Sequence, residues 1–211
     1  MVPMLPLILD LSGRRVVIFG GGPVGARKAR YFLGECQLTV VSRSFSGDIH
    51  GMDVNRVAVD VAAASDEHLR NLVEGAFLVI AALGEPALNN RILRIAREAG
   101  IPCDTASGDR GDVIIPSLCR GRHHLVAVTT FGRSPATARF IRERFSGEAD
   151  LTDRMIDIQD RAREALKGVE PSQERRSEIL REILGDRAAW EILSRDGDSA
   201  RDYIRRRYLH G

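Results

Sequence analysis

The sequence predicts an α/β protein that begins with a parallel sheet covered by helices on both faces, continues into a small α+β segment and ends in a helical region. From residue 15 to about residue 115, short apolar β-branched runs alternate with helical patterns, as in a parallel sheet buried on both faces. Beyond residue 147, no strand pattern remains and helical periodicity continues. The composition of the 211 residues, 44% hydrophobic and 28% charged, is that of an ordinary soluble globular protein.

The strands and helices of the first part follow from this alternation. Strands are expected at five short apolar runs, residues 16–19, 38–41, 57–59, 77–82 and 101–103. Helices are expected at residues 26–32, 66–73 and 89–99. Gly13 and Gly100 lie directly before strands, where a turn needs a flexible backbone. We therefore predict a first domain over residues 1–115.

The pattern changes after residue 115. Residues 125–130 alternate as one further strand, and Ser134 and Pro135 begin a helix that extends to about residue 145. The start of this helix is well specified, because serine caps free N–H groups and proline suits the first helical position. Residues 171–184 predict another helix, whose apolar side holds Ile179, Leu180, Ile183 and Leu184. The expected parts are thus residues 116–147 and a helical domain over residues 148–211.

Charge and cysteine content exclude several classes of protein. Lys and Arg total 31 against 29 for Asp and Glu, so the net charge of +2 gives no general attraction to nucleic acid or membranes. The apolar stretches are shorter than the roughly 18 to 20 residues that span a bilayer, and residues 1–11 lack a signal-peptide pattern. Cys36, Cys103 and Cys119 have neither zinc-site nor disulfide spacing. We expect a cytoplasmic protein with reduced thiols and no metal site.

The strongest motif is a glycine-rich turn between the first strand and the first helix. Gly20, Gly22 and Gly25 form the pattern G-x-G-x-x-G, which is typical of Rossmann-type dinucleotide-binding domains when a strand precedes it and a helix follows. Gly20 permits the tight turn, Gly22 lets the backbone approach a pyrophosphate, and Gly25 lets the helix lie against the strand. The pyrophosphate is expected to accept hydrogen bonds from N–H groups at the positive end of the helix.

The ribose-binding position departs from this pattern. The second strand is expected to end with an Asp or Glu that binds the ribose hydroxyls of NAD, yet it is followed by Ser42, Arg43 and Ser44. A basic residue beside hydroxyls suits a 2′-phosphate, so NAD is expected and NADP remains open, as does a purely solvated Arg43. The residues expected to hold the dinucleotide are Gly20, Gly21, Gly22, Pro23, Val24, Gly25, Ser42, Arg43 and Ala82.

Residues 26–29, Ala-Arg-Lys-Ala, resemble the Ala-x-Arg-Lys helix start of the siroheme synthase family, which includes a precorrin-2 dehydrogenase module. Residues 81–83 with Leu88 and Asn89 resemble its Ala-Ala-Thr and Leu-Asn element, and residues 113–117 its Phe-Ile-Phe-Pro-Ser stretch. The most specific match is residues 125–139, similar to Val-Ala-Val-Ser-Ser-Gly-Gly-x-Ser-Pro-x-x-Ala-Arg. The resemblance covers about residues 5 to 145.

The resemblance implies an activity and an assembly. Members of the family oxidise precorrin-2 to sirohydrochlorin with NAD, and some also insert ferrous iron to make siroheme. They are homodimers that exchange the middle segment, so residues 116–147 are expected to be a dimerisation segment. In such a reaction the protein positions the reacting atoms, while the cofactor accepts the hydride.

Three residues are candidates for taking the proton. The family carries an Asp after the fifth strand, in a pattern like Asn-Val-Val-Asp, but here Ser107 falls at that position because the segment before Pro116 is one residue shorter. Asp104 replaces the family Asn, and Asp109 lies two residues beyond Ser107. Asp109, Ser107 and Asp104 are therefore the catalytic candidates. The alternative that they only form a turn beside Gly108 stays open.

The substrate of the family carries eight carboxylates, so cationic side chains are expected near it. Thr130 matches a family Ser that lines the tetrapyrrole pocket, although an ordinary strand threonine is the alternative. Arg133 and Arg139 adjoin the best-matched motif. The expected substrate-binding residues are Thr130, Arg133 and Arg139.

Two other functions remain open on the sequence alone. A regulatory Rossmann module that senses a dinucleotide without catalysis commonly keeps the acidic ribose ligand, which is absent here, and does not need residues 129–139. An unrelated small NAD(P) oxidoreductase would leave the same element unexplained. Precorrin-2 dehydrogenase is the function that we expect.

Overall fold

A computed structural model gives the structure of residues 4–209. Residues 1–3 and 210–211, the ends of the first and last predicted parts, lie outside the described residues. The chain divides into two compact units between Ile115 and Pro116. Each unit has its own hydrophobic core.

The first unit is built on a five-stranded parallel sheet with the order β3-β2-β1-β4-β5. The strands are β1 (Arg15–Phe19), β2 (Gln37–Ser42), β3 (Asn55–Ala58), β4 (Leu78–Ala81) and β5 (Cys103–Thr105). The helices between them are α1 (Pro23–Phe32), α2 (Gly47–His50), α3 (Asp66–Val73) and α4 (Pro86–Glu98). The strand order reverses at β1, where open α/β sheets bind their ligands.

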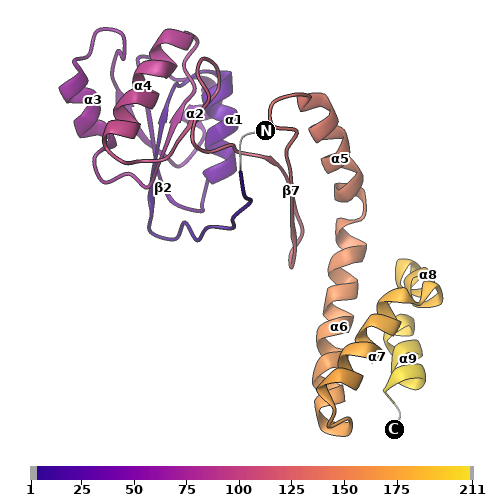
Figure 1. Cartoon of the computed structure of the whole chain (residues 1–211). Coiled ribbons are helices and arrows are strands. Elements are labelled where there is room, and N and C mark those ends of the chain that lie inside the picture. Colours follow the sequence, from indigo (N-terminus) through magenta and orange to yellow (C-terminus); the bar gives the residue numbers. More distant parts are fainter. Residues whose placement is uncertain (1–3, 210–211) are drawn as a thin grey trace. The chain divides into compact units, whose positions relative to one another are not determined.

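Helices cover both faces of this sheet (Figure 1). Along β1, Val17 and Phe19 pack into one core with the apolar side chains of α3 and α4. Val16 and Ile18 point to the opposite face and pack with α1 and α2. The period-two alternation places apolar side chains in both cores, which confirms the predicted doubly covered parallel sheet.

Several boundaries differ from the sequence prediction by one to three residues. Helices α1 and α4 begin at Pro23 and Pro86 rather than at residues 26 and 89, because proline fits the first helical position. The fifth strand begins at Cys103 rather than at residue 101, because the N–H of Ile101 is still bonded to Ala96 in the turn after α4. The short helix α2 was not expected from the sequence.

The second unit begins with an antiparallel pair, β6 (Ser117–Arg120) and β7 (Leu125–Val128), followed by α5 (Pro135–Gly147). The sequence did not predict β6, and β7 ends at Val128 rather than at residue 130. The reason is local, since the hydroxyls of Thr129 and Thr130 bond the backbone of the following turn. Ser134 caps α5 as predicted, because its Oγ accepts a hydrogen bond from the N–H of Thr137.

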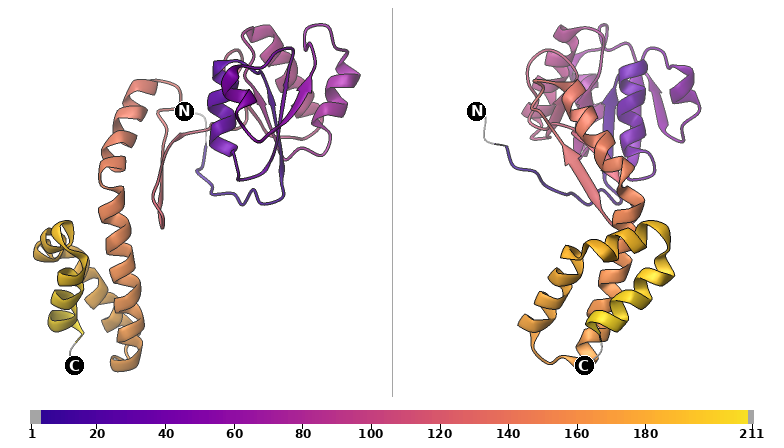
Figure 2. Two further views of the ribbon diagram at one scale, coloured as in Figure 1. Left: turned by 180° about the vertical axis from the view of Figure 1, so that it is seen from behind. Right: turned by 90° about the vertical axis from the view of Figure 1, so that its right-hand side faces the viewer.

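Four further helices complete this unit: α6 (Ala149–Val169), α7 (Gln173–Gly185), α8 (Arg187–Arg195) and α9 (Gly197–Tyr208). The three shorter helices pack beside the long α6 (Figure 2). Ile179 and Ile183 are buried in their core as expected, whereas Leu184 is 47% exposed. The domain boundary expected near residue 148 stays a prediction, and α5 ends there at Gly147. No helix within residues 4–209 has the length and apolar character needed to cross a membrane.

Candidate active site

The glycine loop lies between the ends of β2 and β4. Gly20 has a φ of 128°, and a Cβ there would overlap the carbonyl oxygen of Ala82, directly after β4. A Cβ on Gly21 would overlap the carbonyl oxygen of Ser44, just beyond β2. On the helix side, a Cβ on Gly25 would overlap the carbonyl oxygen of Gly20. The fold therefore brings the predicted loop residues together with the ends of both neighbouring strands.

Gly22 differs from the other three glycines, because a Cβ there would meet no atom within 4 Å. Any residue can adopt its φ of −83°, so the backbone conformation at this position does not require glycine. No side chain caps α1, and the first-turn N–H groups of Val24 and Gly25 have no acceptor within the helix. Open space before uncapped N–H groups fits the diphosphate of a dinucleotide.

The ribose side of the loop is open and basic. The side chain of Arg43 is 79% exposed, and its Nη1 lies 3.5 Å from Oδ2 of Asp60. An exposed ion pair of this length contributes little, so the guanidinium remains accessible to a ligand. Ser42 is the half-buried last residue of β2.

Asp104, in contrast, is buried and paired. Its side chain is 7% exposed, and the Nζ of Lys28 on α1 lies 2.7 Å from its Oδ2. Burial raises the pKa of Asp104, while the Lys28 ammonium opposes that shift. The pair ties the first helix to the fifth strand and leaves the carboxylate engaged. Sequence analysis identified Lys28 only as part of a matched motif and predicted no partner for it.

The fully buried amide of Asn89 joins the loops that follow β4 and β5. Its Oδ1 accepts from the N–H of Leu83 at 2.9 Å, and its Nδ2 donates to the carbonyl of Leu83 at 3.1 Å. The same Nδ2 donates to Oγ of Ser107 at 2.8 Å. Asn89 thus positions Ser107, a role that sequence reasoning missed.

Asp109 has a fixed backbone and an exposed side chain. Its N–H donates to Oδ1 of Asn90 at 2.7 Å, and its carbonyl accepts from the hydroxyl of Thr105 at 2.7 Å. No hydrogen bond or ion pair engages its carboxylate within residues 4–209. Of the three catalytic candidates, Asp109 offers a carboxylate that no neighbour engages within residues 4–209, on a backbone that hydrogen bonds hold in place.

The three predicted substrate-binding residues belong to the second unit. The hydroxyl of Thr130 donates to the carbonyl of Ser134 at 2.9 Å and accepts from its N–H at 3.1 Å, so its one proton is already used. Arg139 is 75% exposed and pairs with Glu143 at 2.7 Å. Arg133 is exposed and has no ion-pair partner within the part of the chain that the structure describes.

The histidines near the tip of the β6–β7 hairpin contact carboxylates of α6. Asp153, 2% exposed, accepts from the N–H groups of Arg122 and His123 at 2.6 and 3.0 Å and lies 2.8 Å from Nδ1 of His124. Burial opposes its ionisation, but these three groups outweigh burial and lower the pKa of Asp153 to about 2. Within residues 4–209, no group of three His, Cys, Asp or Glu side chains is arranged to hold a metal ion.

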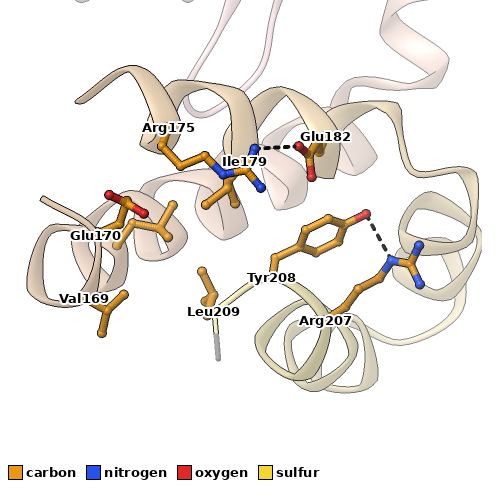
Figure 3. Close-up of a pocket in the computed structure, with 9 residues that line it drawn as sticks. Val169, Glu170, Arg175, Ile179, Glu182, Arg207, Tyr208 and Leu209 are labelled. Carbon is orange, nitrogen blue, oxygen red and sulfur yellow. Dashed lines mark hydrogen bonds and ion pairs between the residues drawn. The ribbon is translucent and has the colours of Figure 1, made fainter. Parts of the chain in front are cut away.

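A pocket in the second unit lies among α6, α7 and α9 (Figure 3). Along α7, Nη1 of Arg175 donates to Glu182 at 3.3 Å, and on α9 Nε of Arg207 donates to the hydroxyl of Tyr208 at 3.2 Å. Both arginines are already engaged within the unit. The pocket therefore presents less unpaired positive charge to an acidic substrate than the turn that carries Arg133.

Comparison with known proteins identifies the family of this chain. Residues 7–117 match the protein family described as "Putative NAD(P)-binding". Over 202 residues, the chain is 39% identical to the protein named "Precorrin-2 dehydrogenase" of Methanosarcina barkeri, and the match covers 93% of this chain and 89% of that protein. The chain belongs to the precorrin-2 dehydrogenase family.

Two further matches agree with that family and confirm the resemblance drawn from the motifs. A siroheme synthase of Neisseria meningitidis is 30% identical over 168 residues, which cover 77% of this chain and 34% of that longer protein. The solved structure described as "SirC, precorrin-2 dehydrogenase" is 25% identical, with a TM-score of 0.71, over 96% of this chain and 100% of that chain. The similarity to precorrin-2 dehydrogenases therefore includes the C-terminal helices.

Proposed function

We propose that the protein oxidises precorrin-2 to sirohydrochlorin with a nicotinamide dinucleotide. The observation that carries this proposal is the 39% identity to a precorrin-2 dehydrogenase over 93% of the chain. The uncapped start of α1 beside the open Gly22 supports it, because a dinucleotide needs that space for its diphosphate.

In this reaction precorrin-2 loses a hydride and a proton. The dinucleotide, when bound, accepts the hydride. The loop of residues 20–25 holds the diphosphate, and the residues after β4 and β5 border the reacting end of the cofactor. The chain contributes placement and a proton acceptor.

Asp109 is the proton acceptor in this proposal. Asn90 and Thr105 hold its backbone from both sides, while its carboxylate stays exposed. Asp104 serves as the partner of Lys28, and Ser107 as a hydroxyl held by Asn89. Both of these side chains are engaged by neighbours, whereas no hydrogen bond or ion pair within residues 4–209 engages the carboxylate of Asp109.

The choice of cofactor is a finer part of the proposal. We favour NAD, the cofactor that the family resemblance implies. The exposed Arg43 and the missing carboxylate at the end of β2 favour some acceptance of NADP. Steady-state kinetics with each dinucleotide measure the preference, and Arg43→Ala should lower kcat/KM with NADP more than with NAD.

Turnover of the whole chain tests the proposal. Purified protein, precorrin-2 and NAD or NADP should produce the absorption spectrum of sirohydrochlorin together with the reduced dinucleotide. Binding of a dinucleotide without turnover of precorrin-2 would favour a sensing module instead. Addition of ferrous iron to the product tests the iron insertion that some members of the family perform.

Three variants separate the catalytic candidates. Asp109→Asn should lower kcat by about 10²- to 10⁴-fold, the usual contribution of a positioned general base. Ser107→Ala should have a smaller effect, and Asp104→Asn should act mainly on stability. An Asp109→Asn enzyme with the wild-type kcat would exclude this residue as the acceptor.

The assembly is also a proposal. The family resemblance implies a homodimer, and the β6–β7 pair leaves Leu125 and Ala127 exposed in the single chain. Sedimentation of the purified protein should give twice the mass of the chain. A monomer that turns over precorrin-2 would refute the dimer and leave the activity standing.

A further inference from the structure

Phe131 has an unusual backbone conformation. It lies in the turn between β7 and α5 with a φ of 54°, and no other residue besides glycine has a positive φ within residues 4–209. For an L-residue with a large side chain, this left-handed conformation costs about 1–2 kcal/mol. A glycine would adopt it without that cost.

The turn holds this conformation through its own hydrogen bonds. The N–H of Phe131 donates to Oγ1 of Thr129 at 3.1 Å, and the N–H of Arg133 donates to the carbonyl of Thr130 at 3.0 Å. Thr130 and Ser134 close the turn with two more bonds. These bonds hold the backbone of Phe131 in the left-handed conformation.

The ring of Phe131 is only partly buried. Phe131 is 48% exposed, so much of its apolar surface remains in water. A strained residue that gains little from packing is more often found at functional sites. Two residues further along the same turn, the exposed guanidinium of Arg133 has no ion-pair partner among the described residues.

An exposed aromatic ring and an unpaired guanidinium on the same turn match a flat ligand with carboxylates at its edge. Aromatic faces stack on flat conjugated rings, and the planar guanidinium forms paired hydrogen bonds with a carboxylate. We infer that the ring of Phe131 stacks on the tetrapyrrole macrocycle, while Arg133 binds one of its peripheral carboxylates. This inference rests on the proposed function and adds Phe131 as a substrate-binding residue.

Phe131→Gly and Phe131→Tyr test the inference through binding of sirohydrochlorin, followed by its absorbance and fluorescence. Phe131→Gly should weaken binding about tenfold, within the range measured for stacking on aromatic side chains, while NAD affinity is unchanged. Its thermal midpoint should not fall, because glycine removes the strain. Phe131→Tyr should retain binding, since it keeps the ring. Wild-type affinity in Phe131→Gly would overturn the inference.

Phe145 provides a matched control. It is also 48% exposed but lies on α5, without a positive φ. Phe145→Leu should bind sirohydrochlorin as the wild type does, and Phe131→Leu should bind it more weakly. If Phe131→Gly instead changes the sedimentation of the protein and leaves affinity per folded chain unchanged, the ring belongs to an interface and the inference is wrong. A wild type that neither binds sirohydrochlorin nor oxidises precorrin-2 would overturn the proposed function itself.

Discussion

Gly22→Asp should separate dinucleotide binding from folding. The residue precedes α1 with an extended backbone, and a Cβ there would meet no atom within 4 Å. Aspartate is also a favoured residue at the start of a helix, where its carboxylate accepts first-turn N–H bonds. In this chain those N–H groups belong to Val24 and Gly25, the groups that would otherwise bind the diphosphate. The variant should therefore fold well and fail to bind.

The effect of the substitution on stability and the effect of NAD on the wild type differ enough in size to be measured separately. Without ligand, the new cap should change stability by a few tenths to about 1 kcal/mol in the favourable direction. For the wild type, NAD at 100 times its Kd adds about 2.7 kcal/mol. For a chain of this size that corresponds to a rise in Tm of about 5–10 °C. Gly22→Asp should show no rise, because its carboxylate both occupies the N–H groups and repels the diphosphate.

Calorimetric titration with NAD and thermal unfolding with and without NAD measure these two effects. Asn71→Asp is the matched control, since it adds the same single charge at an exposed position of α3. This control should keep the ligand-induced rise. An NAD-dependent rise of wild-type size in Gly22→Asp would refute the placement of the diphosphate at this loop.

Three further changes act mainly on the fold. Gly25→Ala should lower the free energy of unfolding in urea by about 1–3 kcal/mol, because the new Cβ overlaps the carbonyl oxygen of Gly20. A more stable variant, as the higher helix propensity of alanine alone predicts, would contradict this close packing. Lys28→Met should lower the free energy of unfolding by about 3–5 kcal/mol near neutral pH, because it leaves the buried Asp104 carboxylate without its counter-ion. This loss of stability should become smaller as the pH falls and Asp104 is protonated. The carboxylate of Asp153, with its pKa at about 2 against an ordinary 3.8, should stabilise the wild type above about pH 4. That stabilisation should fade between about pH 4 and 2, and Asp153→Asn should flatten the urea-denaturation profile there.

The parallel sheet and the glycine loop could be predicted because their signals are local. Strand burial on both faces appears as short apolar runs, and the loop glycines lie close together in the sequence, directly between a strand and a helix. Gly25 illustrates this, since the atom that excludes a Cβ there is the carbonyl of Gly20.

Contacts between distant residues could not be predicted in this way. Lys28 and Asp104 are 76 positions apart, and only the fold shows that they pair. The sequence therefore left Asp104 among the proton acceptors on equal terms with Asp109. The left-handed backbone of Phe131 was equally hidden, because its side chain disfavours that conformation and gives no sign of it.

Asn89 lies between these two cases, because part of its role is visible in the sequence. It precedes Ile92, Leu93 and Ala96 at helical spacing, so it occupies the apolar side of α4. A polar side chain on a buried helix face costs free energy unless hydrogen bonds satisfy it. Since α4 begins at the carboxyl edge of the sheet, the partners of Asn89 must come from loops at that edge, where the ligands of such sheets bind. The periodicity could thus have indicated that Asn89 supports the site, although the sequence analysis missed it, whereas the identity of its partners, Leu83 and Ser107, requires the structure.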